Sequence, residues 1–255
     1  MRAISLQPIL YKQKPNLQAA SAKLESFLGT NQIKSRDVLK SSLIKWLGTY
    51  DNGYPNPPSR LDLSKWRIFS ENTAQLLEAD KLFPLFDLWR MILLDPRIGL
   101  ELSQGTQPFE TFLDKARSSL ESPSAESRSP RNTLVTLLRL LSNAFTSPEL
   151  SGVLLLRHLR QSVMAVVVPC LLHADSAVRT AAAGVAFNAA TRYQAARVSH
   201  YRDGKPGDTV PETLGDEDWE MELTTALLEA LSQETESEEV GEWICDYSFK
   251  SMLTY

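Results

Sequence analysis

Apolar residues recur every three or four positions along most of the chain, which is the spacing of helices with one buried face. This spacing predicts helices over residues 17–28, 38–47, 66–77, 81–94, 109–120, 134–145, 149–159, 163–172, 177–197 and 216–231. No segment alternates apolar and polar residues convincingly with the period of a β-strand. The chain is therefore expected to be all-α, with about ten helices.

Proline, glycine and small polar residues predict where these helices begin and end. Asp95-Pro96 is expected to close the helix over 81–94, because the residue before proline avoids helical geometry. Asp175 or Ser176 is expected to cap the helix that follows it. The segments 50–59, 122–130 and 201–214 are predicted loops, the second of them mobile.

One predicted helix is apolar on nearly every side. Ala181–Ala190 consists mostly of alanine, with Phe187 supplying bulk. Such a helix has to be covered by neighbours, as in the middle layer of a stacked helical array. Because internal repeats are hard to see, the pattern alone leaves both a helical solenoid and a compact bundle open. In the helix over 66–77, the predicted core-facing residues are Trp66, Phe69, Thr73, Leu76 and Leu77.

Composition restricts the class of protein without changing this picture. The chain has 255 residues, of which 43% are hydrophobic and 23% charged, and this is typical of a globular protein. The longest apolar run, 163–172, is about half a membrane span, and the amino terminus carries no secretory leader. We expect a cytoplasmic monomer that binds neither membrane nor nucleic acid, with the nucleus open as a second compartment.

The net charge of −4 conceals a strong asymmetry between the two parts of the chain. Residues 1–205 carry 26 Lys and Arg against 17 Asp and Glu, whereas residues 206–255 carry one Lys and 14 acidic residues. One interpretation is a solvated acidic helix near the end of the chain. The other is a basic body that binds an acidic partner, with the acidic end tuning that site.

The sequence offers little enzymatic chemistry. Phosphate-binding loops, nucleophile elbows and zinc-protease motifs are not found, so we expect no enzyme, cofactor or metal. The histidines at 158, 173 and 200 do not have metal-site spacing. Cys170 lies in an apolar context that would suppress its reactivity, and Cys245 belongs to no redox motif.

More informative are polar side chains set into apolar helices. Arg90 is surrounded by large apolar residues, and the pairs Arg139/Asn143 and Asn188/Arg192 are each spaced four apart on one helix face. These five residues can line a groove in which arginine meets carboxylates and asparagine binds a peptide backbone. Salt bridges between helices and asparagine ladders inside a solenoid would explain the same residues.

Several ordered blocks resemble the PUL domain. Residues 82–97 are similar to its FPxxDLxRxxxLDPR block, 138–146 to its RxLxNxF helix and 178–188 to its RxAAAxxxxN segment. The acidic segment 219–231 is similar to its late helix. The blocks occur in the family's order and cover about residues 10–240. We therefore assign residues 1–18 to a linker or N-terminal extension, 19–242 to the domain and 243–255 to an atypical tail.

The resemblance implies a fold and a function. The fold is an armadillo-like α-solenoid, and the function is a non-enzymatic adaptor in ubiquitin-dependent protein turnover. The implied partner is the acidic C-terminal tail of an AAA+ segregase, valosin-containing protein. Arg90, Arg139 and Arg192 would pair with its carboxylates, while Asn143 and Asn188 clamp its backbone.

Residues 7–24 refine the resemblance. They are similar to the linker that precedes the PUL domain in fungal proteins with a PPPDE peptidase and a thioredoxin domain. Those catalytic residues lie outside the resemblance, so no hydrolase or redox activity is carried over. The family would continue beyond Glu242 with an apolar closing helix that 243–255 does not resemble. The alternative function is a remnant of such a fusion that serves as a scaffold for another partner.

Overall fold

The computed structural model describes residues 7–13, 15–29, 50–51, 54–55, 62–105, 107–121, 131–155, 157–203 and 218–233. This part of the chain folds into ten α-helices, one 3-10 helix and one two-residue β-ribbon. The predicted all-α, armadillo-like α-solenoid is confirmed. The predicted helix over 38–47, most of the loop over 201–214 and the tail over 243–255 lie outside the described residues.

The elements follow one another along the chain in the order given next. They are α1 (Leu17–Leu28), β1 (Tyr50–Asp51), β2 (Tyr54–Pro55), α4 (Leu63–Leu76), η2 (Ala79–Lys81), α5 (Phe83–Ile92), α6 (Pro96–Leu102), α7 (Phe109–Glu121), α8 (Arg131–Ala144), α9 (Pro148–Leu154), α10 (Arg157–Leu171), α11 (Ser176–Asp203) and α12 (Asp218–Gln233). The short antiparallel ribbon β1–β2 lies within the loop predicted over 50–59.

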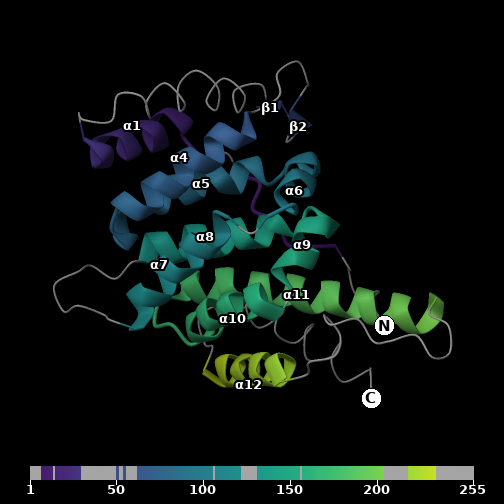
Figure 1. Cartoon of the computed structure of the whole chain (residues 1–255). Coiled ribbons are helices and arrows are strands. Elements are labelled where there is room, and N and C mark those ends of the chain that lie inside the picture. Colours follow the sequence, from purple (N-terminus) through teal and green to yellow (C-terminus); the bar gives the residue numbers. More distant parts are fainter. Residues whose placement is uncertain are drawn as a thin grey trace.

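The helices stack in chain order, from α1 at the top of Figure 1 to α12 at the bottom. Within the stack, α5 packs against α8 and α8 packs against α11, which makes these three helices a continuous middle layer. The core of this stack is contiguous and rich in rings. Trp89 is completely buried, with Trp66 5.8 Å and Phe112 6.4 Å from it between ring centroids.

The alanine-rich segment is buried, as its composition predicts. Ala181, Ala182, Ala183 and Ala186 are all at most 1% exposed, because α11 lies between α8 and α10. The helix continues to Asp203, six residues beyond the predicted end at Arg197. Among the predicted core-facing residues of 66–77, Trp66, Phe69, Thr73 and Leu77 are buried as expected. The prediction for Leu76 is wrong, because Leu76 is 57% exposed.

Proline 96 begins a helix that the sequence analysis missed. The helix predicted over 81–94 is α5, which ends at Ile92, and Pro96 then occupies the first position of α6. Asp95 caps α6, since its Oδ1 accepts a hydrogen bond from the backbone N–H of Arg97 at 3.0 Å. Proline is well suited to this position because the first helical N–H has no partner inside the helix.

The predicted boundary between 149–159 and 163–172 is also wrong. The first helix, α9, ends at Leu154, and α10 already begins at Arg157. Arg160, which lies between the two predicted helices, is 1% exposed, and its guanidinium carbon lies 5.3 Å above the ring of Trp219 in α12. An arginine held against an aromatic ring can therefore remain inside the helix.

Among the described residues, no single helix has the length and apolar composition needed to span a membrane. The bent pair formed by α9 and Leu159–Leu171 passes the same test when its two members are taken together.

Two glycines provide a matched test of the contact between α6 and α9. A Cβ at Gly99 would lie 2.2 Å from the Cβ of Ser147, whereas a Cβ at Gly152 would meet nothing within 4 Å. We expect Gly99→Ala to lower the free energy of unfolding by about 1–3 kcal/mol, as overpacking does. The control, Gly152→Ala in α9, should leave stability unchanged or raise it by about 0.5–1 kcal/mol. Urea unfolding monitored by circular dichroism would measure both; equal effects would contradict the close approach.

Candidate functional site

The predicted groove residues surround an extended segment of the same chain. Residues 7–13, here called the strap, cross the middle layer of helices instead of joining it (Figure 1). Pro8 to Tyr11 are half-buried, while Gln7, Lys12 and Gln13 are exposed. The strap thus lies on the groove surface as a peptide ligand would, and it belongs to the segment predicted to be a linker or extension.

Two asparagines hold the strap by its backbone. The side chain of Asn188 in α11 accepts a hydrogen bond from the N–H of Ile9 at 2.7 Å and donates one to the carbonyl of Ile9 at 2.9 Å. Asn143 in α8 makes the same pair with Tyr11, at 2.7 Å and 3.0 Å. The clamped residues are two positions apart, and in an extended chain such residues direct their N–H and C=O groups to the same side.

The same two carboxamides also join neighbouring helices. Asn143 donates a second hydrogen bond to the carbonyl of Arg90 in α5 at 2.8 Å, and Asn188 donates one to the carbonyl of Ser142 in α8 at 3.3 Å. Both carbonyls belong to the last turn of their helix, where acceptors lack partners within the helix. Both asparagines are at most 1% exposed. The interpretation as links between helices is therefore seen directly, while the backbone that the asparagines clamp here belongs to the same chain.

Arg90 adds a third clamp and is already neutralised. Its Nη1 donates to the carbonyl of Tyr11 at 2.7 Å, while its Nε and Nη2 lie 2.8 Å and 2.7 Å from Oδ1 of Asp87. The side chain is 5% exposed, and burial at this depth requires such a partner. Arg90 therefore fixes the strap through a backbone carbonyl.

Arg139 is placed differently from Arg90. Its guanidinium carbon lies 5.2 Å from the centre of the Tyr11 ring, a cation–π geometry. Within the described part of the chain its buried Nε has no hydrogen-bond partner, and no acidic residue is paired with it. Arg139 is thus a positive charge beside the strap that has no acidic partner among the described residues.

A glycine makes room for the strap side chains. A Cβ at Gly184 in α11 would lie 3.1 Å from the Tyr11 hydroxyl and 3.7 Å from Cγ2 of Ile9. Both side chains therefore point toward the small-residue surface of α11. The small residues of α11 are therefore approached closely by the strap as well as by neighbouring helices.

Arg192 lies at the margin of this arrangement. Its Nη2 donates to the carbonyl of Pro148 at the start of α9, at 3.2 Å, and the structure gives it no contact with the strap. Four of the five predicted groove residues, Arg90, Arg139, Asn143 and Asn188, are therefore brought together around residues 9–11. The sequence analysis missed the strap, for which the pairing of β-branched Ile9 with aromatic Tyr11 at strand spacing was the available signal.

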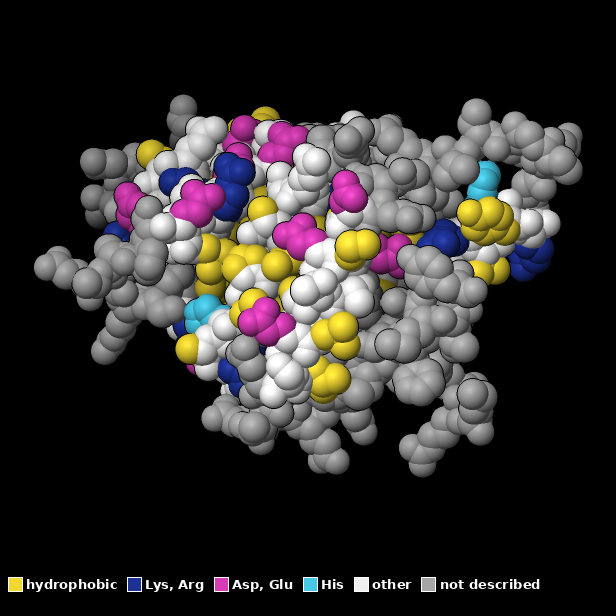
Figure 2. Space-filling view, turned by 90° about the horizontal axis from the view of Figure 1, so that it is seen from below, with side chains coloured by type: hydrophobic (Ala, Val, Ile, Leu, Met, Phe, Trp, Pro, Cys, Tyr) yellow, Lys and Arg dark blue, Asp and Glu magenta, His cyan; other side chains and the backbone are white. Residues whose placement is uncertain are grey.

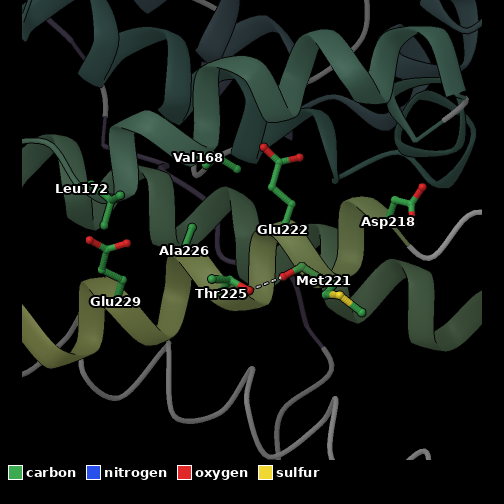
Figure 3. A pocket seen from close by; sticks show the side chains of 8 residues that line it. All are labelled: Val168, Leu172, Asp218, Met221, Glu222, Thr225, Ala226 and Glu229. Atoms are coloured by element: carbon green, nitrogen blue, oxygen red, sulfur yellow. Dashed lines mark hydrogen bonds between the residues drawn. The ribbon is translucent and has the colours of Figure 1, made fainter.

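A second hollow lies between α10 and α12, on the face seen from below in Figure 2. Its volume is about 420 Å³, and Figure 3 shows its lining: Val168, Leu172, Asp218, Met221, Glu222, Thr225, Ala226 and Glu229. Acidic side chains rim this hollow and no basic residue lines it. An acidic ligand would be repelled there, whereas the groove with Arg139 would attract it.

A comparison with known protein families shows to which family this helical stack belongs. The model of the PUL domain matches residues 5–242, which include the strap and nearly the whole helical stack. The chain belongs to the PUL domain family. No curated protein and no solved structure matches it significantly. PUL is a protein-interaction domain, which supports a role in binding another protein.

The remaining chemistry of this PUL domain is sparse in the described part of the chain. No group of three His, Cys, Asp or Glu residues there is arranged to hold a metal ion. Cys170 is completely buried, and burial raises the pKa of its thiol to about 12. Cys245 lies outside the described residues.

Replacing one carboxamide tests the clamp. Asn143→Asp keeps the acceptor for the Tyr11 N–H but turns the donor into an oxygen that faces the carbonyls of Tyr11 and Arg90. We expect the free energy of unfolding to fall by on the order of 3 kcal/mol, because buried acceptors lose their donor beside a buried charge. Asn132→Asp, an exposed change on the same helix, should stay within about 0.5 kcal/mol of wild type. Thermal and urea unfolding would check both variants, and similar losses would argue against the clamp.

Cys170 should be inert while the domain is folded. The thiolate is the reactive form, and a thiol with a pKa of about 12 is almost entirely protonated at about pH 8. We expect iodoacetamide to modify Cys170 only after unfolding in guanidinium, as measured by peptide mass mapping. Modification of the folded domain at the rate of free glutathione would contradict this assignment.

Proposed function

We propose that this PUL domain is a non-enzymatic adaptor that binds the acidic C-terminal tail of an AAA+ segregase of the valosin-containing protein type in ubiquitin-dependent protein turnover. The observation that carries the proposal is the bidentate clamping of an extended backbone by Asn143 and Asn188. Family membership supports a protein partner, and the groove supplies the chemistry for a peptide.

Backbone clamping suits a flexible tail. A carboxamide that pairs with both N–H and C=O of one residue recognises the main chain, so it accepts extended segments of many sequences. The distance between the two clamps corresponds to two residues of such a chain. A disordered tail can therefore be seated in the groove without a preformed structure of its own.

The positive charge of residues 1–205 favours an acidic tail over a basic one as the ligand. The chain up to residue 205 has nine more basic than acidic residues, which would steer a negatively charged peptide toward the domain. Inside the groove, Arg139 offers an unneutralised guanidinium next to Tyr11. A carboxylate of the tail could form a charge-assisted hydrogen bond there, which is stronger than a neutral one.

A titration with a fluorescent peptide of the segregase's C-terminal residues tests this function. We expect binding that weakens severalfold between about 50 mM and about 500 mM salt, because charge steering is screened. Arg139→Ala should weaken binding about tenfold, as expected when a charge-assisted contact of roughly 1.4 kcal/mol is lost. Fluorescence anisotropy measures both effects.

Arg117→Ala is the matched control. It removes the same charge from α7, where Arg117 is exposed and paired with Asp114 and Glu121. Equal loss in the two variants would mean that only net charge matters. No binding by a well-folded domain would reject the segregase tail and favour the alternative, a scaffold for another partner.

A further inference from the structure

The hollow between α10 and α12 has an apolar floor that is open to the outside. Val168 of α10, Leu172 just after it and Ala226 of α12 form the floor, and Met221 borders it (Figure 3). Leu172 is 38% exposed and Met221 is 73% exposed. The last helix that the structure describes is α12, at the bottom of the stack in Figure 1, so no further described helix covers this face.

Carboxylates follow one edge of this hollow in helical register. Asp218, Glu222 and Glu229 are spaced four and then seven residues apart, so they share one face of α12 with Thr225. In Figure 3 the side chains of Glu222 and Glu229 stand on the side of α12 that faces α10. The row extends over about 16 Å, at about 1.5 Å per helical residue. Like charges at this spacing repel one another, and a ligand that brings positive charge relieves the repulsion.

We infer that this hollow binds a basic amphipathic helix of a second protein partner. The apolar face of that helix packs on Val168, Leu172 and Met221, while its Lys and Arg side chains reach the carboxylate row. Helices dock into grooves in this way through side chains spaced three and four apart. Lys and Arg are suited to the place, because their aliphatic stems cover apolar surface while their charged ends reach the acidic edge.

The charge of the chain indicates an occupant from outside. Residues 234–255, which follow α12, contain six Asp and Glu but only one Lys, so the acidic edge repels them. The whole segment 206–255 carries 14 acidic residues and one Lys, and it attracts a basic helix toward this end of the domain. Nucleic acids and anionic membranes are repelled by the same charge. The hollow and the groove with Arg139 therefore select partners of opposite charge, which gives the proposed adaptor a second binding site.

A lysine in place of Leu172 tests the site in the full chain. Its ammonium would supply from within the hollow the charge that the ligand brings, and Leu172 is exposed enough to be replaced. Leu100→Lys in α6 is the matched control, because Leu100 is 51% exposed and the two variants have the same net charge. The probe is a fluorescent model helix of about 14 residues, about 21 Å long, with leucine on one face and lysine on the other. Fluorescence anisotropy measures binding, and circular dichroism checks each fold.

We expect Leu172→Lys to bind the probe about tenfold more weakly than wild type, and Leu100→Lys to stay within about twofold of wild type. A probe with glutamate in place of lysine should not bind. A lysine probe with a central proline should bind about tenfold more weakly, because proline breaks its helix. If Leu172→Lys does not fold, the double variant Glu222→Gln and Glu229→Gln replaces it with the same expectation, since both residues are exposed.

Three results would overturn the inference. Failure of the folded wild type to bind the lysine probe rejects a basic helix. Equal losses in Leu172→Lys and Leu100→Lys reduce the effect to net charge, and equal binding of the proline probe rejects a helical partner. Light scattering adds the alternative of a second copy: a wild-type dimer that Leu172→Lys makes monomeric would assign the hollow to self-association instead.

The segregase tail peptide keeps this inference separate from the proposed function. Arg139→Ala should leave binding of the lysine probe unchanged, and Leu172→Lys should leave binding of the tail peptide unchanged. If the tail peptide binds no variant but the lysine probe distinguishes Leu172→Lys from its control, the hollow is supported and the proposed segregase partner is rejected. If each variant weakens both peptides equally, the two sites are not independent and the second site is rejected.

Discussion

Two buried carboxamides join neighbouring helices to the strap. Each of Asn143 and Asn188 links its own helix, the end of the preceding helix in the middle layer and the backbone of the strap. Each uses its acceptor once and its amino group twice, so three of its four hydrogen-bonding positions are filled. Because an unsatisfied buried amide costs about 1–3 kcal/mol, the strap and the helix ends stabilise each other through these side chains.

This constraint explains the spacing of the middle layer. A carboxamide can reach the last turn of a neighbouring helix only when the two helices lie close together, and small residues allow that approach. Alanines line α11 where it meets α8, and Gly184 leaves space for the strap side chains. Packing and peptide recognition therefore depend on the same small residues. A larger side chain at these positions would disturb the stack and the groove at once.

The sequence predicted the stack better than the site. Helical spacing was sufficient for an all-α fold, because each periodic segment reports its own buried face, whereas the choice of a solenoid over a compact bundle came from the family resemblance. One error arose where a local signal had two meanings, because Pro96 begins a helix instead of only ending one. Another arose where a contact distant in sequence decides the outcome, because Arg160 lies inside α10 and against Trp219. Five residues were predicted to lie together, since arginine and asparagine are costly in apolar helices unless bound, and four of them do. Their partner in the structure was not predicted, because the strap is far away in sequence and the asparagines and Arg90 bind its backbone, which leaves no mark on its side chains.

The sequence analysis gave Arg90 and Arg139 the same role, but the structure gives them different contacts. Arg90 carries its own carboxylate in Asp87 at i−3, so its charge is cancelled locally and its remaining donor is directed at a carbonyl. Arg139 has no carboxylate partner among the described residues and faces the Tyr11 ring. A neutralised arginine can recognise a main chain, but it adds little attraction for an acidic peptide. In the seated strap, the contact with the aromatic ring therefore rests on Arg139, while the register of the backbone rests on the asparagines and Arg90.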